Sequence, residues 1–196
     1  MRWMRFVSLA VFAMCVVASA MLWSCTAEKH EAPEAGMTPA QTLARGRYLF
    51  LTLGCNDCHT PGSMYGAPDT TRMVAGSELG WKGPWGISFP RNITPDSATG
   101  IGTWTEDQIV TAVREGRRPD NTPLLPPMPW PDFANLTNED AHALAAYLKT
   151  LPPVHHPNIE TVPPGQKYSG RYLELPPPPA WDAPKGPPPG GAAAGQ

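Results

Sequence analysis

The sequence predicts a mostly α-helical domain with three main helices joined by long loops. Three segments carry apolar residues at helical spacing behind a helix-start signal, and no segment shows the alternation of a convincing β-strand. The expected loops, residues 62–103 and 117–135, are long enough to need something to pack against. About 115 residues remain for this domain once both termini are set aside, which is enough for a single core.

The first expected helix begins at Thr38, with Pro39 at the first helical position and Gln41 three residues after the cap. Thr38 and Gln41 have the spacing of a capping box, and proline is favoured at the first position because its missing N–H would have no partner there. One face then carries apolar or small residues at helical spacing, which are Leu43, Gly46, Phe50 and Leu53. This helix leads directly into the segment at residue 55.

The second expected helix begins at Thr105, which can pair with Gln108 as a capping box, and it stops at Gly116. The third begins at Thr137, with Asp140 at the capping-box position. The side chains expected to be buried are Ile109, Ala112 and Val113 in the second helix and Ala141, Leu144, Ala145 and Leu148 in the third, which Pro152 ends.

Residues 55–59 read C-N-D-C-H, which is the attachment signature of a c-type haem. Cys55 and Cys58 can each add to one haem vinyl group, and His59 is then held beneath the iron as its proximal ligand. A redox dithiol and half of a zinc site are the alternatives for such a pair. However, no cysteine follows Cys58, and a Gly- and Pro-rich stretch follows instead of a strand and helix. The motif therefore predicts one covalent haem c, which would also give the long loops an apolar surface to pack against.

The N-terminus has the pattern of an export signal, in agreement with haem attachment outside the cytoplasm. Arg2 and Arg5 precede an uncharged run that ends in L-W-S-C, and this ending resembles a lipobox with cleavage before Cys25 and acylation of its thiol. Two alternatives stay open, namely ordinary cleavage after Ala20 and an uncleaved membrane anchor. The expected organisation is a signal peptide at 1–24, a flexible tether at 25–37, the domain at 38–153 and a Pro/Gly-rich tail at 154–196 that is extended or disordered.

The use of cysteine agrees with this organisation. Cys15 leaves with the signal, Cys25 would carry lipid, and the pair at 55 and 58 would carry haem, so that none remains for a disulfide. The 15 basic and 17 acidic side chains become 13 and 17 when the two leader arginines are removed, a net charge of −4. No basic patch or basic helix is present, which argues against nucleic acid as a partner.

A second axial ligand is expected in the loop before the third helix. Met128 lies between Pro127 and Pro129, and flanking prolines hold a backbone extended so that one side chain is presented rigidly. A methionine thioether is a known sixth ligand of c-type haem. The rivals are Met64 and Met73, while the remaining histidines are expected on the surface, His142 on the polar flank of the third helix and His155 and His156 in solvent.

Further residues complete a pattern from about residue 40 to 153. They are Gly46 and Phe50 before the haem motif, the stretches 92–96 and 99–102 followed by Trp104, Met128 between its prolines, and Leu144, Tyr147 and residues 151–153 at the end. This pattern resembles a bacterial class I cytochrome c, and most closely the cytochrome c domains of membrane-bound alcohol and sugar dehydrogenase cytochrome subunits. Those subunits usually carry three haem motifs, whereas this chain has one.

The resemblance implies a cytochrome c fold in which the first and last helices cross at Gly46, with Phe50 and Tyr147 around the crossing. It also implies that the Trp104 indole donates a hydrogen bond to a haem propionate, whose charge Arg91 could offset. The alternatives for these two residues are a core tryptophan and a surface arginine.

The function expected from the sequence is a periplasm-facing carrier of single electrons, with a haem c ligated by His59 and Met128. It would not be an enzyme, because both axial positions are filled by protein. The expected partners are a periplasmic dehydrogenase, a terminal oxidase, and a membrane reached through lipid on Cys25 or an uncleaved anchor; a soluble periplasmic form is the alternative. Two other functions stay open, a haem subunit of a membrane-associated dehydrogenase or oxidase complex, and a gas- or peroxide-reactive protein with an open iron.

Overall fold

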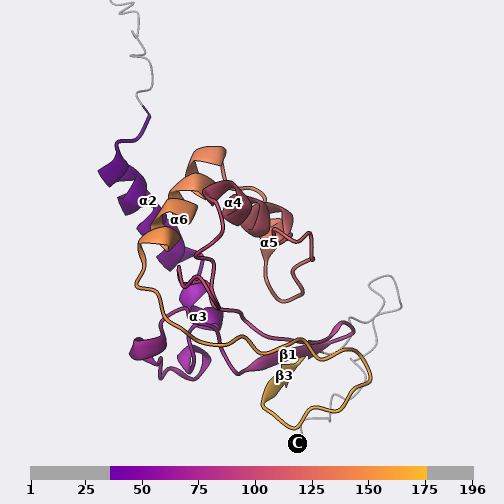
Figure 1. Ribbon diagram of the computed structural model, residues 1–196. Helices are drawn as coiled ribbons and strands as arrows, with labels where there is room; N and C mark the ends of the chain where they lie inside the picture. Colours follow the sequence, from indigo (N-terminus) through magenta and orange to yellow (C-terminus); the bar gives the residue numbers. More distant parts are fainter. Residues whose placement is uncertain (1–35, 176–196) are drawn as a thin grey trace, which may run out of the picture. The chain divides into compact units, whose positions relative to one another are not determined.

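The computed structural model describes residues 36–175 (Figure 1). The expected signal peptide, Cys25 and the end of the tail lie outside the described residues. The helices are α2 (Pro39–Thr52), α3 (Cys55–His59), α4 (Glu106–Glu115), α5 (Trp130–Phe133) and α6 (Asn138–Thr150), with 3₁₀ turns η1 (Ser63–Tyr65) and η2 (Thr70–Arg72) and strands β1 (Gly80–Gly83), β2 (Gly86–Ser88) and β3 (Tyr172–Glu174). In the described part of the chain, no helix is long and apolar enough to span a bilayer.

The three main helices expected from the sequence are confirmed as α2, α4 and α6. Both complete capping boxes form: Gln41 N donates to Thr38 Oγ1 at 3.4 Å, and Thr38 N donates to Gln41 Oε1 at 2.8 Å. The corresponding bonds join Thr105 and Gln108 at 3.2 and 2.9 Å. Gly116 ends α4 with a left-handed φ of 67°. These boundaries were predictable because each depends on residues within one turn.

The third capping motif is only half formed, because Asp140 has another partner. Asp140 N donates to Thr137 Oγ1 at 3.1 Å, but its carboxylate accepts two bonds from Arg45 on α2, at 2.7 and 2.9 Å. The bonds from Arg45 hold the pKa of the Asp140 carboxyl below its usual value. Any contribution of this pair to stability is therefore present above the carboxyl's unfolded pKa and is lost as pH falls through the lower folded one.

Helices α2 and α6 lie against each other at Gly46 (Figure 1). A Cβ at Gly46 would stand 2.0 Å from the Ala143 carbonyl oxygen and 2.7 Å from Tyr147 Cβ. The Phe50 and Tyr147 rings pack beside this point, with centroids 5.4 Å apart and planes tilted by 54°. The expected helix crossing is therefore confirmed, and it requires a residue without a side chain.

We expect Gly46→Ala to destabilise the haem-loaded protein by about 2 kcal/mol or more, because the added methyl would collide with the backbone of α6. The sign of this stability change is informative, since a Gly to Ala substitution inside an exposed helix stabilises a protein by about 1 kcal/mol. Chemical denaturation measures the effect. The matched control is Arg47→Ala, one residue further along α2 and exposed, which should change stability by less than about 0.5 kcal/mol. A Gly46→Ala protein as stable as wild type would contradict the described crossing.

The hydrophobic core lies between the three main helices and the loop that precedes α4. Trp104 and Cys55 pack against its edge, so the haem motif is joined directly to the core. The buried members are Leu49, Phe50, Val74, Ile101, Ile109, Leu144, Ala145 and Leu148.

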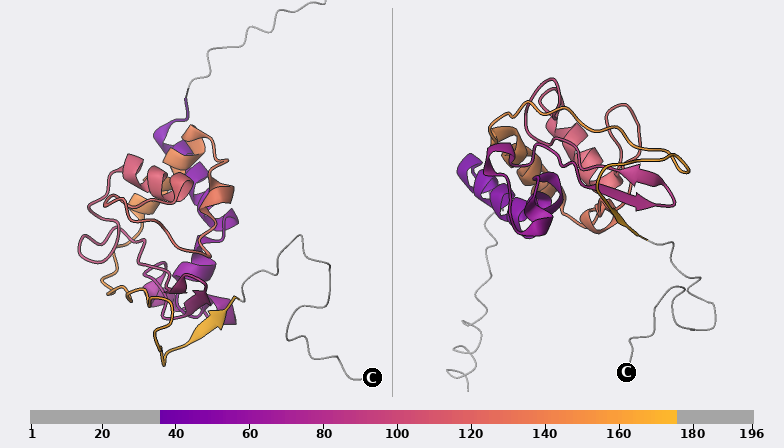
Figure 2. Two further views of the ribbon diagram at one scale, coloured as in Figure 1. Left: turned by 90° about the vertical axis from the view of Figure 1, so that its right-hand side faces the viewer. Right: turned by 90° about the horizontal axis from the view of Figure 1, so that it is seen from below.

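A small sheet with strand order β2-β1-β3 was not expected from the sequence. Strands β1 and β2 form an antiparallel hairpin, and β3 pairs with β1 in parallel. The two further views in Figure 2 place this sheet away from the α2 and α6 pair. These strands were not predicted, because strands this short show no alternating pattern and β3 comes from the distant C-terminal segment.

Residues 154–175, which we call the C-terminal strap, pack on the domain instead of leaving it at residue 153. After α6 the strap passes beside the loop at 92–99 and returns to the sheet, where it supplies β3 (Figure 1). A backbone bridge between Val162 and Ile87 adds a second attachment. The strap therefore differs from the extended tail that its proline content indicated, since its polar groups find partners on the domain.

Candidate haem attachment site

The haem motif forms its own short helix at the end of α2. Gly54 has a left-handed φ of 68°, which lets the chain turn sharply from α2 into α3. Cys55 and Cys58 are half-buried free thiols within a single helical turn, and Cys55 also packs against the core. This arrangement presents two thiols side by side with the imidazole of the next residue, as two-point attachment of a haem requires.

The surroundings of the two thiols argue against a redox dithiol. Burial raises the pKa of the Cys55 thiol to about 11, and burial also raises the pKa of the Cys58 thiol. Redox-active C-x-x-C pairs show the opposite shift, because their chemistry needs a stabilised thiolate near neutral pH. The raised pKa values therefore argue against a redox dithiol.

His59 is oriented by a backbone carbonyl. Its Nδ1 lies 2.7 Å from the Arg91 carbonyl oxygen, and because a carbonyl can only accept, Nδ1 carries the proton. The lone pair is then on Nε2, for which the described residues provide no hydrogen-bond partner. Burial lowers the pKa of His59, so the ring is neutral at neutral pH. A neutral imidazole with its second nitrogen fixed by an outer partner is what a metal ligand requires, so the residues present fit an axial haem ligand.

The segment after His59 is locked to two neighbouring loops. Thr60 is buried, its hydroxyl donates to Asn56 Oδ1 at 2.7 Å, and it accepts from Val74 N at 2.8 Å. Gly76 N donates to the His59 carbonyl at 2.9 Å. Val74 holds a positive φ of 50°, which is costly for a β-branched residue and is maintained by this packing.

Asn92 forms a fully bonded buried junction behind His59. It is 3 % exposed, its side-chain nitrogen donates to Thr99 Oγ1 and the Val154 carbonyl, and its side-chain oxygen accepts from the backbone and hydroxyl of Thr94. The N-x-T sequence that starts here is therefore part of a structural loop. Because every polar atom of the amide is used, the loop that carries Arg91 is held in one position.

Met128 lies in a loop that is attached to the domain at two points shortly before the methionine. Leu124 N donates to the Gly116 carbonyl at 2.7 Å, and the Ser88 hydroxyl on β2 donates to the Pro126 carbonyl. Met128 itself is half-buried immediately before α5. The unexpected sheet thus has a clear role, since β2 holds the loop that the sequence marked as ligand-bearing.

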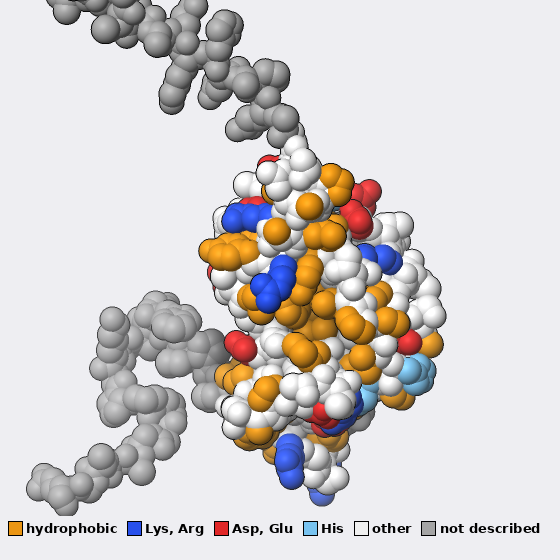
Figure 3. Space-filling view, turned by 90° about the vertical axis from the view of Figure 1, so that its left-hand side faces the viewer, with side chains coloured by type: hydrophobic (Ala, Val, Ile, Leu, Met, Phe, Trp, Pro, Cys, Tyr) orange, Lys and Arg blue, Asp and Glu red, His pale blue; other side chains and the backbone are white. Residues whose placement is uncertain are grey.

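The rival methionines lie in the two 3₁₀ turns that follow the haem motif. Met64 is within η1 and 45 % exposed, and Met73 follows η2 and is 40 % exposed. Figure 3 shows hydrophobic side chains gathered on the face seen from the side of α2.

Arg91, whose carbonyl binds His59, has a second arginine, Arg118, nearby. Burial lowers the pKa of Arg118, and the nearby charge of Arg91 lowers it further. Arg91 also pairs with Glu160 on the strap at 3.6 Å. The sequence marked Arg91 through the family resemblance. Trp104 packs on the core, which agrees with the alternative of a core tryptophan.

The strap contributes residues that the sequence did not single out. Asn158 Oδ1 accepts from Asn92 N at 2.7 Å, and Asn158 Nδ2 donates to the Thr99 carbonyl at 2.6 Å. The expectation that His156 lies in solvent is wrong, because its side chain is 19 % exposed and its Nε2 lies 2.9 Å from Arg72 Nη1. His155 is exposed as expected, at 65 %. Non-local contacts of this kind leave no periodic or spacing signal in a sequence.

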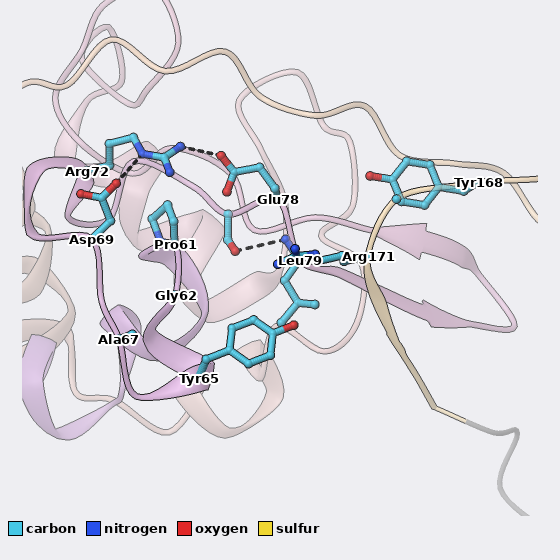
Figure 4. Close-up of a pocket in the computed structure, with 12 residues that line it drawn as sticks. Pro61, Gly62, Tyr65, Ala67, Asp69, Arg72, Glu78, Leu79, Tyr168 and Arg171 are labelled. Atoms are coloured by element: carbon cyan, nitrogen blue, oxygen red, sulfur yellow. Dashed lines mark hydrogen bonds and ion pairs between the residues drawn. The ribbon is translucent and has the colours of Figure 1, made fainter.

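A hollow of about 500 Å³ lies next to the motif but contains none of its residues. Arg72 lies at one side, between the carboxylates of Asp69 and Glu78, while Tyr65 and Tyr168 approach from the turn and the strap (Figure 4). Hydrogen bonds from Thr71 and then Arg72 lower the pKa of Asp69 to about 2. Because neither cysteine of the motif nor His59 lines it, this hollow is not assigned as the haem site.

Comparison with known proteins identifies the class. Residues 43–152 match the cytochrome c family, so the chain belongs to that family. It is accordingly an electron-transfer protein with covalently bound haem c, which confirms the fold, the cofactor class and the electron-carrying role expected from the sequence.

Three of the proteins to which the chain is similar are two dehydrogenase cytochrome subunits and a dihaem cytochrome. The chain is 36 % identical over 129 residues to the fructose dehydrogenase cytochrome subunit of Gluconobacter japonicus (63 % of this chain, 25 % of that one). It is 36 % identical over 105 residues to the cytochrome c subunit of the quinone alcohol dehydrogenase of Gluconobacter oxydans (54 % and 20 %). It is 33 % identical over 143 residues to a dihaem c-type cytochrome of Cereibacter sphaeroides (70 % and 45 %). The chain therefore spans less than half the length of each of these relatives.

Proposed function

We propose that this cytochrome is a carrier of single electrons with one haem, attached through Cys55 and Cys58 and ligated by His59 and Met128. The observation that carries the proposal is the state of His59, whose Nδ1 is bound to the Arg91 carbonyl at 2.7 Å while Nε2 stays available. The haem, when bound, supplies a one-electron couple. The single C-x-x-C-H in the sequence supports a count of one.

Met128 is the proposed second axial ligand, because its loop is attached to α4 at one end and to β2 through Ser88. If the His59 imidazole and the Met128 thioether both held the haem iron, no position would be left for a small molecule, which would favour electron transfer over gas or peroxide chemistry. Thioether ligation also favours the reduced state and raises the reduction potential. The positive charges of Arg91 and Arg118 would offset the negative charges of the haem propionates.

A dehydrogenase is the proposed electron donor, because two of the relatives are named as dehydrogenase cytochrome subunits. A terminal oxidase is the proposed acceptor. The same names favour a second candidate function, that of a haem subunit held permanently in a dehydrogenase complex. Purification in mild detergent separates the two candidates, since a free carrier elutes alone whereas a subunit elutes with a dehydrogenase.

The proposed location is the periplasmic side of a membrane, reached through a lipid on Cys25 after removal of residues 1–24. The charged leader, the apolar run and the position of Cys25 support this proposal, and residues 25–37 would form the tether. Mass spectrometry of the mature N-terminal peptide tests it. An acylated Cys25 is expected, whereas an N-terminus at Met21 would indicate a soluble protein.

We expect a redox titration of the intact protein, followed by visible absorption, to give one transition with a one-electron slope of about 59 mV per tenfold change in ratio. The reason is that a single iron with both axial positions filled exchanges one electron without a coupled ligand step. The measured haem content should be one per chain. Two resolved transitions, or two haems per chain, would contradict the single-haem carrier.

A further inference from the structure

The peptide group between Arg91 and Asn92 is hydrogen-bonded at both of its polar atoms. Its carbonyl oxygen accepts from His59 Nδ1 at 2.7 Å. Its N–H donates to the side-chain oxygen of Asn158 at 2.7 Å. A continuous chain of hydrogen bonds thus runs from the strap through one amide to the proximal histidine.

Such a chain has a definite electrostatic effect. When the N–H of an amide donates a hydrogen bond, the amide is polarised and its carbonyl oxygen becomes a stronger acceptor. A stronger acceptor at Nδ1 draws the proton away from the imidazole, which makes Nε2 more basic and a stronger donor to a metal. A more strongly donating ligand stabilises the oxidised metal, which lowers the reduction potential.

We propose that Asn158 is a positioning residue for His59, acting through the Arg91–Asn92 peptide to fix the imidazole and lower the reduction potential. This inference rests on the proposed function, in which His59 is the proximal ligand. Asn158 lies six residues beyond the end of the family match at residue 152, so the strap adds to the site an element from outside the matched segment.

The strap holds Asn158 in place on both sides. On the N-terminal side of Asn158, the Val154 carbonyl accepts a hydrogen bond from Asn92 Nδ2 at 2.8 Å, and His156 N donates one to Thr99 Oγ1 at 3.1 Å. On the C-terminal side of Asn158, Val162 forms a backbone bridge to Ile87 on β2. The side chain itself makes a second bond, from Nδ2 to the Thr99 carbonyl at 2.6 Å.

The peptide is also prevented from rotating away from His59. Gly76 packs against it so closely that a Cβ there would lie 3.1 Å from Asn92 N and 3.2 Å from the Arg91 carbonyl carbon. Gly76 N donates in turn to the His59 carbonyl. The peptide is thus enclosed by Gly76, His59 and Asn158, and loss of the Asn158 acceptor should change its polarisation more than its position.

The test is Asn158→Ala in the full-length, haem-loaded protein. The reduction potential should rise by the equivalent of a three- to tenfold change in the ratio of oxidised to reduced protein, where tenfold corresponds to about 59 mV. The absorption spectrum should stay that of a fully ligated haem. The His59 Nδ1 proton, observed by NMR, should exchange faster with solvent because its hydrogen bond is weaker.

Two further variants separate polarisation from packing. Thr99→Val removes the bonds from Asn92 Nδ2 and His156 N, and the bond that the Thr99 hydroxyl donates to Asp96, yet keeps the contact between Asn158 and the peptide N–H. It should therefore lower stability while shifting the reduction potential by less than Asn158→Ala does. Asn158→Asp keeps an acceptor oxygen and should not raise the potential above that of wild type.

Equal shifts in Asn158→Ala and Thr99→Val, or an unchanged potential in Asn158→Ala with a normal spectrum, would overturn the role of Asn158 and leave the proposed function intact. A wild-type protein whose haem is not ligated by His59 would overturn the proposed function instead. The two failures are therefore distinguishable by the wild-type spectrum alone.

Discussion

Met128→Ala should convert the protein from a closed electron carrier into a haem protein with an accessible iron. Loss of the thioether removes the far-red absorption band of the oxidised protein and lets carbon monoxide bind the reduced form. The reduction potential should fall by roughly 100 mV or more, within the range of about 0.8 V over which axial ligands act. The domain should still fold, because the covalent attachment, His59 and the core between α2, α4 and α6 are unchanged.

The matched controls are Met64→Ala and Met73→Ala, whose side chains lie in or after the 3₁₀ turns and are more exposed than Met128. Both controls should keep the far-red band and exclude carbon monoxide. If one of them lost the band while Met128→Ala kept it, the electron carrier would stand and the assigned ligand would be wrong.

The double variant Cys55→Ala, Cys58→Ala should lose all covalently bound haem, because each vinyl bond needs its own thiol. It should also fail to accumulate, since the loops at 62–103 and 117–135 lose the group against which they are proposed to pack. Cys55 additionally contacts the core, so its truncation weakens the junction between α3 and α2. The measurement is a haem-stained denaturing gel together with the amount of protein recovered.

Cys25→Ser is the control for this experiment, because it removes a thiol outside the motif. We expect full haem staining in this variant, whatever happens to its membrane attachment. A band of wild-type intensity in the Cys55 and Cys58 double variant would show that the motif does not attach the haem.

Much of the fold was predictable because its signals are local. The boxes at Thr38 and Thr105 and the left-handed Gly116 each involve neighbours within one helical turn, and all three appear in the structure. The capping motif at Thr137 shows where local signals fail, because only one of its two hydrogen bonds forms. The Asp140 carboxylate turns instead to Arg45, a residue 95 positions away that no local pattern can indicate.

The strap and the sheet were missed for a related reason. Proline content indicated an extended tail, and proline does limit helices and strands, but the strap packs through side-chain amides and single backbone bridges. Strand β3 has only three residues, and its partner β1 is distant in the sequence. Neither the length nor the composition of β3 therefore marks it as a strand.

In the candidate site, too, the residues of local motifs were predictable and the contacts between distant residues were not. Cys55, Cys58 and His59 are contiguous, so the motif could be read directly, and Met128 was indicated by its flanking prolines. The second interaction of His59 is with a backbone carbonyl, which any residue type could supply. Asn158, which is bonded to the same peptide, is an ordinary asparagine in the sequence and gains its role only from the path of the strap.

The central claim is that a covalently attached haem is closed on both faces by His59 and Met128, and carbon monoxide tests it most directly. Visible spectra of the purified wild-type protein should be recorded oxidised, reduced, and reduced under carbon monoxide. We predict a far-red band in the oxidised spectrum and no change in the reduced spectrum when carbon monoxide is added, because no axial position is free. A rapid shift of the reduced spectrum under carbon monoxide would contradict the closed carrier and indicate an open iron.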